Sequence, residues 1–111
     1  MGDAAFGMSG LDIETSARAG VPITTIVMNN GGMATYPGGF PTAREKFGVS
    51  RMQGDYAALA DAMGAVGITV KKTGEIVPAL KKAQQLNIDG KTVLLDMHTR
   101  HEDSRAPDTF A

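Results

Sequence analysis

Short apolar segments alternate with helical patterns along this chain, and this alternation constrains its fold more than any other feature. Three segments are typical of strands: residues 23–29 (ITTIVMN), 66–70 (VGITV) and 92–97 (TVLLDM). The first of them is nearly all apolar and rich in β-branched residues, which is typical of a strand covered on both faces. Strands that alternate with helices predict a parallel sheet with helices on its faces.

Helical patterns lie before the first strand and in the two intervals between strands. An apolar stripe with a 3.6-residue period precedes the second strand, and Asp55 is its expected N-cap residue. A second stripe precedes the third strand, with Thr73 as its expected cap. We expect the first helix over residues 9–19, with Ser9 opening a capping box and Gly20 ending the helix.

The predicted fold is therefore an α/β three-layer sandwich with a short parallel sheet of the doubly wound type. A doubly wound unit opens with a strand, whereas this chain opens with a glycine-rich segment, MGDAAFGMSG. We therefore expect the chain to lack its first strand and to be the carboxyl-terminal piece of a longer α/β domain. Residues 1–98 are the expected domain, and residues 99–111 are an expected polar tail.

Charge and composition exclude several classes of function. The 111 residues include 11 basic and 12 acidic side chains, so no strong field attracts nucleic acid or an anionic membrane. No apolar run reaches the ~18 residues of a membrane helix, and the first residues lack the pattern of a signal peptide. The chain has no cysteine, which excludes disulfides and thiolate chemistry. We expect a cytoplasmic protein that binds neither nucleic acid nor membrane.

Two polar segments are expected to meet at one edge of the sheet. Residues 2–5 (GDAA) precede the first helix, and residues 29–32 (NNGG) follow the first strand. Because neighbouring parallel strands lie about 5 Å apart and end at the same edge, we expect Asp3 and Asn30 to converge there. Carboxylate and amide oxygens are the ligands that Mg²⁺ or Ca²⁺ prefers, and helix N–H groups favour an anion. A diphosphate that carries Mg²⁺ satisfies both requirements.

The same residues resemble a known family. Gly2-Asp3-Ala4 followed by Asn29-Asn30 resembles the thiamine diphosphate (TPP) motif, usually written GDG…NN, with alanine at its third position. The connecting segment and the later stretches GDYAALADAMGAVG and EIVPALKKA are similar to the same family. The resemblance covers about residues 2–97. It is greatest to the C-terminal, diphosphate-binding domain of acetolactate synthases and 2-oxoacid decarboxylases.

The resemblance implies a magnesium site built from three residues. Asp3 would bind Mg²⁺ through its carboxylate, and Asn30 would bind it through its side-chain oxygen. Gly32 would contribute its backbone carbonyl. Oxygens of the diphosphate and a water molecule would complete the six ligands.

The resemblance also implies contacts with the cofactor itself. Ala4 and Ala5 would donate backbone N–H groups to the diphosphate, and small side chains here let the backbone approach closely. Gly2 and Met33 complete the set of residues that we expect to bind the cofactor. No catalytic residue is expected in this chain.

The activity implied for the whole enzyme is that of a TPP-dependent lyase or transferase, in which the cofactor attacks a 2-oxoacid and CO₂ leaves. Activation of the cofactor needs a carboxylic acid from a pyrimidine-binding domain, of the same or a partner subunit. We therefore expect this chain to be inactive alone, and the full enzyme to be a homo-oligomer. Some relatives use FAD, but nothing in this segment indicates it.

Other readings of the sequence remain open. His98 and His101 are metal-ligand types, yet a solvated charge run in the polar tail is the favoured interpretation. Residues 36–40 (YPGGF) could cover the cofactor or form a plain surface loop. The chain could also be a non-catalytic α/β fragment or interaction module. A third alternative is an unrelated doubly wound domain that binds another phosphate-bearing cofactor.

Overall fold

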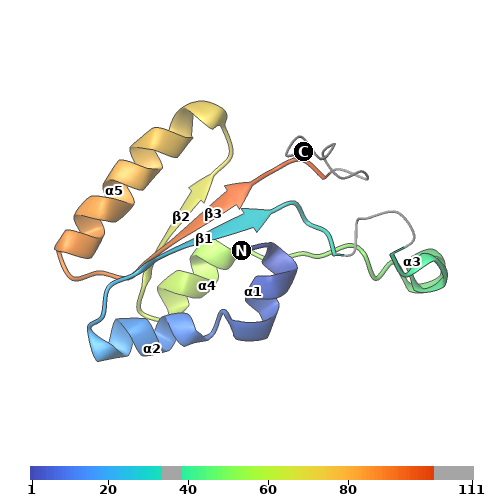
Figure 1. Ribbon diagram of the computed structural model, residues 1–111, viewed down its shortest axis with the longest axis horizontal. Helices are drawn as coiled ribbons and strands as arrows, with labels where there is room; N and C mark the ends of the chain where they lie inside the picture. Colours follow the sequence, from blue (N-terminus) through green and yellow to red (C-terminus); the bar gives the residue numbers. More distant parts are fainter. Residues whose placement is uncertain (34–38, 102–111) are drawn as a thin grey trace, which may run out of the picture.

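The computed structural model describes residues 1–33 and 39–101, which form a three-stranded sheet with helices on both faces (Figure 1). Both the predicted fold class and the alternation of strands and helices are confirmed. The elements in chain order are α1 (Asp3–Ser9), α2 (Asp12–Ala19), β1 (Thr24–Asn29), α3 (Pro41–Phe47), α4 (Tyr56–Ala62), β2 (Val66–Val70), the 3₁₀ helix η1 (Thr73–Glu75), α5 (Ile76–Ile88) and β3 (Val93–His98).

The last strand in the sequence lies at the centre of the sheet. The strand order is β1-β3-β2, and both pairings are parallel. Leu95 of β3 is in register with Ile26 of β1 on one side and with Ile68 of β2 on the other. All three strands lie within one residue of their predicted bounds.

Burial follows from the strand order. Residues 93–97 of the central strand are all buried, whereas Val27 is the only buried residue of β1. β1 nevertheless packs on both faces as expected, because Val27 and the partly buried Ile26 belong to apolar clusters on opposite faces of the sheet. Its burial is less complete than that of β3, because β1 is an edge strand and β3 has a neighbouring strand on each side.

The core consists of two apolar clusters, which lie on opposite faces of the sheet. Successive side chains of a strand point to opposite faces, so Leu94 and Leu95 belong to different clusters. The α4 face carries α1, α2 and α4, and the α5 face carries α5 (Figure 1). The buried residues of the α4 face are Phe6, Ile13, Val27, Tyr56, Ala60, Ala65 and Leu94, and those of the α5 face are Val70, Ala79, Ala83, Val93, Leu95 and Met97.

The region before β1 differs from the prediction. Two helices, α1 and α2, replace the single helix expected over residues 9–19, and the break falls at Gly10. An added Cβ at Gly10 would lie 2.5 Å from the ring of Phe6, so only glycine lets the chain turn this closely. Ser9 ends α1 and opens no helix, so the predicted capping box is wrong. Gly20 ends α2 in the left-handed conformation, as predicted.

Most of the later helix boundaries agree with those predicted from the sequence. Asp55 caps α4 by accepting a hydrogen bond from the Ala58 N–H at 2.8 Å. Thr73 opens the 3₁₀ turn η1, so α5 itself begins three residues later than its expected cap. The short helix α3 was not predicted, although Pro41 at its start and Gly48 after its end are typical helix boundaries. No helix within residues 1–33 and 39–101 has the length and apolar character needed to cross a membrane.

Candidate functional site

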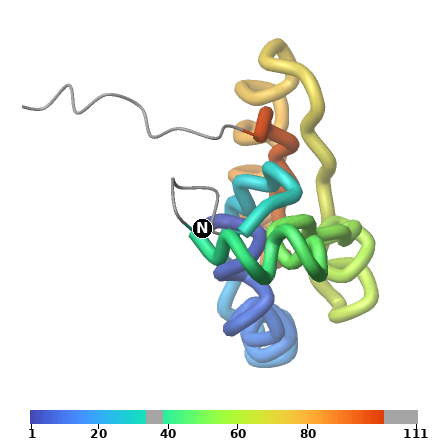
Figure 2. Tube along the Cα trace, turned by 90° about the vertical axis from the view of Figure 1, so that its right-hand side faces the viewer, coloured from blue at the N-terminus to red at the C-terminus, as the bar shows by residue number. Residues whose placement is uncertain are grey.

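The first two residues of the chain place Asp3 beside the end of β1. Gly2 forms a parallel bridge with Met28, whose N–H donates to the Met1 carbonyl at 2.8 Å. Because this bridge is parallel, the residues that follow it, Asp3 after Gly2 and Asn29 after Met28, lie side by side. Figure 2 looks toward the carboxyl ends of the strands, where the start of α1 lies next to the end of β1. Asp3 and the Asn29–Asn30 pair thus reach the same edge of the sheet.

Asp3 has a carboxylate oxygen without a partner. The residue is 2% exposed and lies in the first turn of α1, not in a loop as the sequence suggested. Its Oδ1 accepts a hydrogen bond from the Ala4 N–H at 3.0 Å. Its Oδ2 is buried and has no hydrogen-bond partner among the described residues. Because a buried charge without full compensation is costly, this oxygen is suited to a cation.

The turn after β1 is held by the side chains of its two asparagines. Asn29 Oδ1 accepts from the Gly31 N–H at 3.2 Å, and Asn30 Oδ1 accepts from the Gly32 N–H at 3.0 Å. Gly31 has a φ of +65°, which glycine adopts without strain. The two amides therefore fix where the Asn30 oxygen and the Gly32 backbone lie.

Residues 50–52, which are distant in the sequence, form backbone hydrogen bonds with the same turn. Gly32 forms an antiparallel bridge with Arg51. The Met52 N–H donates to the Gly31 carbonyl, and the Met33 N–H donates to the Ser50 carbonyl, both at 3.0 Å. Residues 50–52 thus make the turn part of the folded framework.

Asp96 is a buried carboxylate that sequence reasoning did not single out. It is 1% exposed within β3 and lies on the α4 face, the face of Leu94. Its Oδ1 accepts a hydrogen bond from Asn29 Nδ2 at 2.9 Å, and its Oδ2 lies 3.4 Å from His98 Nε2. The one signal in the sequence was an acidic residue inside an otherwise apolar strand.

Tyr56 lies within the electrostatic reach of both buried carboxylates. Burial raises the pKa of its phenol above the usual 10.0, and the charges of Asp3 and Asp96 raise it further. The ring packs edge-to-face on Phe6, with centroids 5.3 Å apart. Tyr56 therefore borders the polar edge from α4.

The remaining predicted residues occupy this edge in different ways. Ala4 and Ala5 are half-buried in the first turn of α1, and the Ala4 N–H is already engaged by Asp3. An added Cβ at Gly2 would meet no other protein atom within 4 Å. Gly32 is buried, whereas Met33 is 39% exposed.

The donor set suits a hard cation. Within the described ranges, no group of three or more His, Cys, Asp or Glu residues gathers to hold a metal. What gathers at this edge is one carboxylate with an unpartnered oxygen, one carboxamide and a glycine backbone. These are oxygen ligands, and Mg²⁺ is commonly held by one or two carboxylates together with the phosphates of its ligand. The residues at this edge therefore fit a Mg²⁺ ion bound together with a phosphate-bearing ligand.

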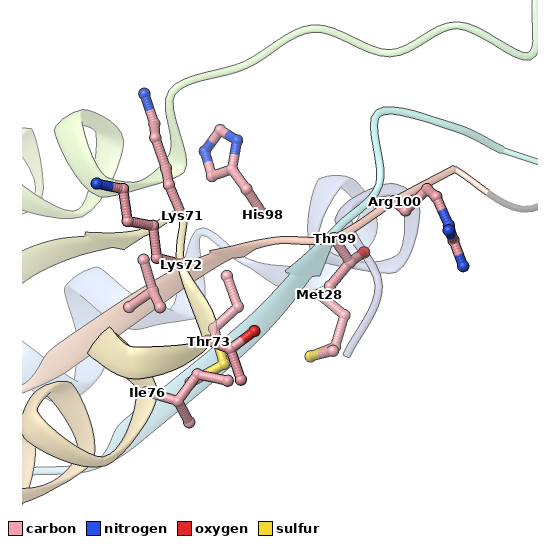
Figure 3. Close-up of a pocket in the computed structure, with 10 residues that line it drawn as sticks. Met28, Lys71, Lys72, Thr73, Ile76, His98, Thr99 and Arg100 are labelled. Atoms are coloured by element: carbon pink, nitrogen blue, oxygen red, sulfur yellow. The ribbon is translucent and has the colours of Figure 1, made fainter.

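A separate pocket of about 290 Å³ opens at the other side of the strand ends (Figure 3). Met28, Ile76 and Met97 give it an apolar lining, and none of the predicted site residues lines it. In Figure 3 the side chains of Lys71 and His98 rise on one side of the strand ends, away from Ile76. This pocket is thus distinct from the polar edge at Asp3.

The structure describes only part of two further candidates from the sequence, the His98–His101 segment and the YPGGF segment. His98 is the last residue of β3 and contacts Asp96, so it does not belong to a free charge run. His101 is half-buried and lines a different pocket, together with Arg44 and Arg51. Of the YPGGF segment, residues 36–38 lie outside the described residues, as do residues 102–111.

A family model and several known proteins match most of the chain. The family model described as "Thiamine pyrophosphate enzyme, C-terminal TPP binding domain" matches residues 1–97. Oxalyl-CoA decarboxylase of Escherichia coli (strain K12) is 38% identical over 85 residues, which cover 71% of this chain and 14% of that protein. The acetolactate synthase large subunit of Corynebacterium glutamicum is 31% identical over 98 residues, which cover 78% of this chain and 15% of that protein.

A solved structure has the same fold. The thiamine diphosphate-dependent 4-hydroxybenzoylformate decarboxylase of Rhodococcus jostii RHA1 superposes with a TM-score of 0.76 at 21% identity, over 94% of this chain and 20% of that one. The chain thus spans about a fifth or less of the length of each of these three proteins.

Proposed function

The chain belongs to the family of thiamine pyrophosphate enzymes, as their C-terminal TPP-binding domain, and from that premise we propose that its Asp3–Asn30 edge binds the diphosphate of TPP through Mg²⁺. The observation that carries the proposal is the buried Asp3 Oδ2, which has no partner among the described residues. A divalent cation would supply the missing partner.

Each residue of the edge has a part in this proposal. Asp3, Asn30 and Gly32 would hold Mg²⁺ through a carboxylate, an amide and a backbone oxygen. The Ala5 N–H and the positive end of α1 favour the anionic diphosphate. The Ala4 N–H would either keep its bond to Asp3 Oδ1 or turn to the diphosphate. The hydrogen bonds of the asparagine turn mean that little reorganisation is needed on binding.

The whole enzyme is proposed to be a decarboxylase or carboligase of 2-oxo acids that resembles acetolactate synthase. When bound, TPP supplies the carbon nucleophile and the electron sink for that chemistry. This chain binds and orients the diphosphate end. A pyrimidine-binding domain, of the same or a partner subunit in a homo-oligomer, would supply the acid that activates the cofactor. The chain alone would therefore be inactive, and the enzyme cytoplasmic.

Titration calorimetry tests the binding proposal. We expect TPP to bind the chain in the presence of Mg²⁺ and at least about tenfold more weakly after chelation of the metal. Asp3→Ala and Asn30→Ala should each produce a loss of similar size. Asp89→Ala, which removes an exposed carboxylate in the turn after α5, is the matched control.

Two results would contradict the proposal. Binding that is equally strong with and without metal would remove Mg²⁺ from it. No binding at millimolar TPP would instead favour a non-catalytic α/β module that keeps only the fold.

A further inference from the structure

Asp96 is a costly residue for the interior of a central strand. Its neighbours in β3, Leu95 and Met97, are buried apolar residues, and it is itself 1% exposed. A buried carboxylate pays for its lost hydration unless specific donors compensate it. A well-packed apolar residue would serve the core at least as well, so core packing does not account for this carboxylate.

The contacts of Asp96 lead directly to the candidate magnesium site. Its Oδ1 accepts from Asn29 Nδ2 at 2.9 Å. The same carboxamide accepts the Gly31 N–H on its oxygen at 3.2 Å. The bond from Asp96 therefore decides which end of the Asn29 amide faces the turn, because a carboxylate can only accept.

The orientation of Asn29 in turn sets the geometry of the residues that follow. With its oxygen on the Gly31 N–H, the backbone turns so that Asn30 Oδ1 meets the Gly32 N–H at 3.0 Å. Rotation of the Asn29 amide by half a turn would present its NH₂ group to the Gly31 N–H and break this turn. Asn30 and Gly32 are the two proposed ligands on this side of the site.

We propose that Asp96 is a positioning residue, which fixes the Asn29 amide and through it the turn that presents Asn30 and Gly32 to Mg²⁺. The mention of Mg²⁺ rests on the proposed function, whereas the effect on the turn does not. Asp96 touches neither metal nor cofactor in this account, and it acts only through Asn29.

The first test uses the chain without ligand. In Asp96→Ala, which removes the acceptor of Asn29 Nδ2, we expect the backbone amide resonances of Gly31 and Gly32 to shift and their hydrogen exchange to accelerate about tenfold, the size of one lost charge-assisted hydrogen bond. The matched control is Asp89→Ala, because Asp89 Oδ1 also accepts from a carboxamide, Gln85 Nε2, at 3.0 Å but far from the site. That control should leave both glycine amides unchanged.

The second test is a double-mutant cycle on metal affinity. Asp96→Ala and Asn29→Ala should each weaken the apparent affinity for Mg²⁺ at saturating TPP by about tenfold. Because one residue acts through the other, the double variant should be no weaker than the weaker single variant. A merely structural carboxylate would give additive losses.

The outcomes are separable. Unchanged Gly31 and Gly32 amides in Asp96→Ala, or additive losses in the cycle, would overturn the positioning role. If Asp96→Ala does not fold, the glycine amides of Asn29→Ala decide instead, and their failure to shift overturns the role. If the unaltered chain binds no TPP, the proposed function fails while the amide test still decides the role of Asp96.

Discussion

The two faces of the sheet bury different chemistry at the same edge. On the α4 face, the carboxyl ends of the strands hold the buried carboxylates of Asp3 and Asp96 and the phenol of Tyr56. On the α5 face, the corresponding positions are apolar, with Val70 and Met97 buried over a shallow pocket. One strand, β3, serves both faces because successive side chains alternate.

The difference teaches which buried groups the fold itself requires. The α5 face is stable with apolar side chains alone, so the sheet needs no buried charge at this edge. We therefore expect the carboxylates of the α4 face to lower stability and to serve the proposed site, as strained or charged groups at functional sites commonly do.

The largest expected effect concerns how tightly the α4 face is packed. An added Cβ at Gly67 in β2 would lie 2.0 Å from the Ala57 carbonyl oxygen, and this neighbour is backbone. Gly67→Ala should therefore lower the free energy of unfolding by about 3 kcal/mol or more, measured by urea denaturation. Gly74→Ala in η1, where a Cβ meets nothing within 4 Å, should change it little. Equal effects of the two variants would show that α4 does not pack closely on β2 at Gly67.

An effect of intermediate size on the free energy of unfolding distinguishes Asp3, proposed to serve the site, from Asp55, which serves the fold. Asp3→Ala removes an oxygen without a partner among the described residues, so it should raise the free energy of unfolding of the metal-free chain by about 1 kcal/mol. Asp55→Ala removes the N-cap of α4 and should lower it by about 1 kcal/mol. Thermal and urea denaturation without Mg²⁺ measure both. A loss of stability in Asp3→Ala would mean that Asp3 serves the fold.

The charge of the α4 face is also visible through Tyr56. Its pKa is raised above 10.0, first by burial and then by Asp3 and Asp96. Because the folded value exceeds the unfolded one, this contribution to stability is complete below pH 10.0 and is lost as pH rises through the folded value. Phenolate absorbance in a Tyr36→Phe background should report a lower pKa for Asp3→Asn and for Asp96→Asn. An unchanged titration curve would place both carboxylates away from the phenol.

The smallest effect is expected at the loop that leads to the α5 face. Glu75 Oε2 accepts the backbone N–H groups of Lys71 and Lys72, both at 3.0 Å, and these bonds lower its pKa below the usual 4.5. Its contribution is therefore present above pH 4.5 and is lost as pH falls through the folded value. Glu75→Gln should narrow the stability difference between pH 7 and pH 3 only slightly. A large change would mean that this exposed loop supports the fold more than its burial indicates.

The sequence predicted the strands well and the site partly. Runs of β-branched and apolar residues define a strand wherever it lies, so β2 was predicted to the residue. Asp3 and Asn30 could be brought to one edge from the parallel topology alone. Their partners in the turn are local hydrogen bonds, which the NNGG segment is well suited to form.

The rest depends on information that periodicity does not contain. Alternation assigns Asp96 to a face, but only the strand order β1-β3-β2 places it opposite Val27 and within reach of Asn29. The break at Gly10 depends on contact with the Phe6 ring, a packing event that no stripe of residues announces. The role of Asp96 and the break at Gly10 were therefore not predicted because both depend on tertiary contacts.

The central claim is that the metal lies at the Asp3–Asn30 edge, and paramagnetic broadening tests it most directly. Mn²⁺ prefers the same oxygen ligands as Mg²⁺ and broadens nearby amide resonances. With TPP and substoichiometric Mn²⁺, we expect the amides of Ala4, Gly31 and Gly32 to broaden first, while those of Lys72 and Thr73 beside the α5-face pocket stay sharp. Broadening centred on that pocket, or spread evenly over the chain, would contradict the account.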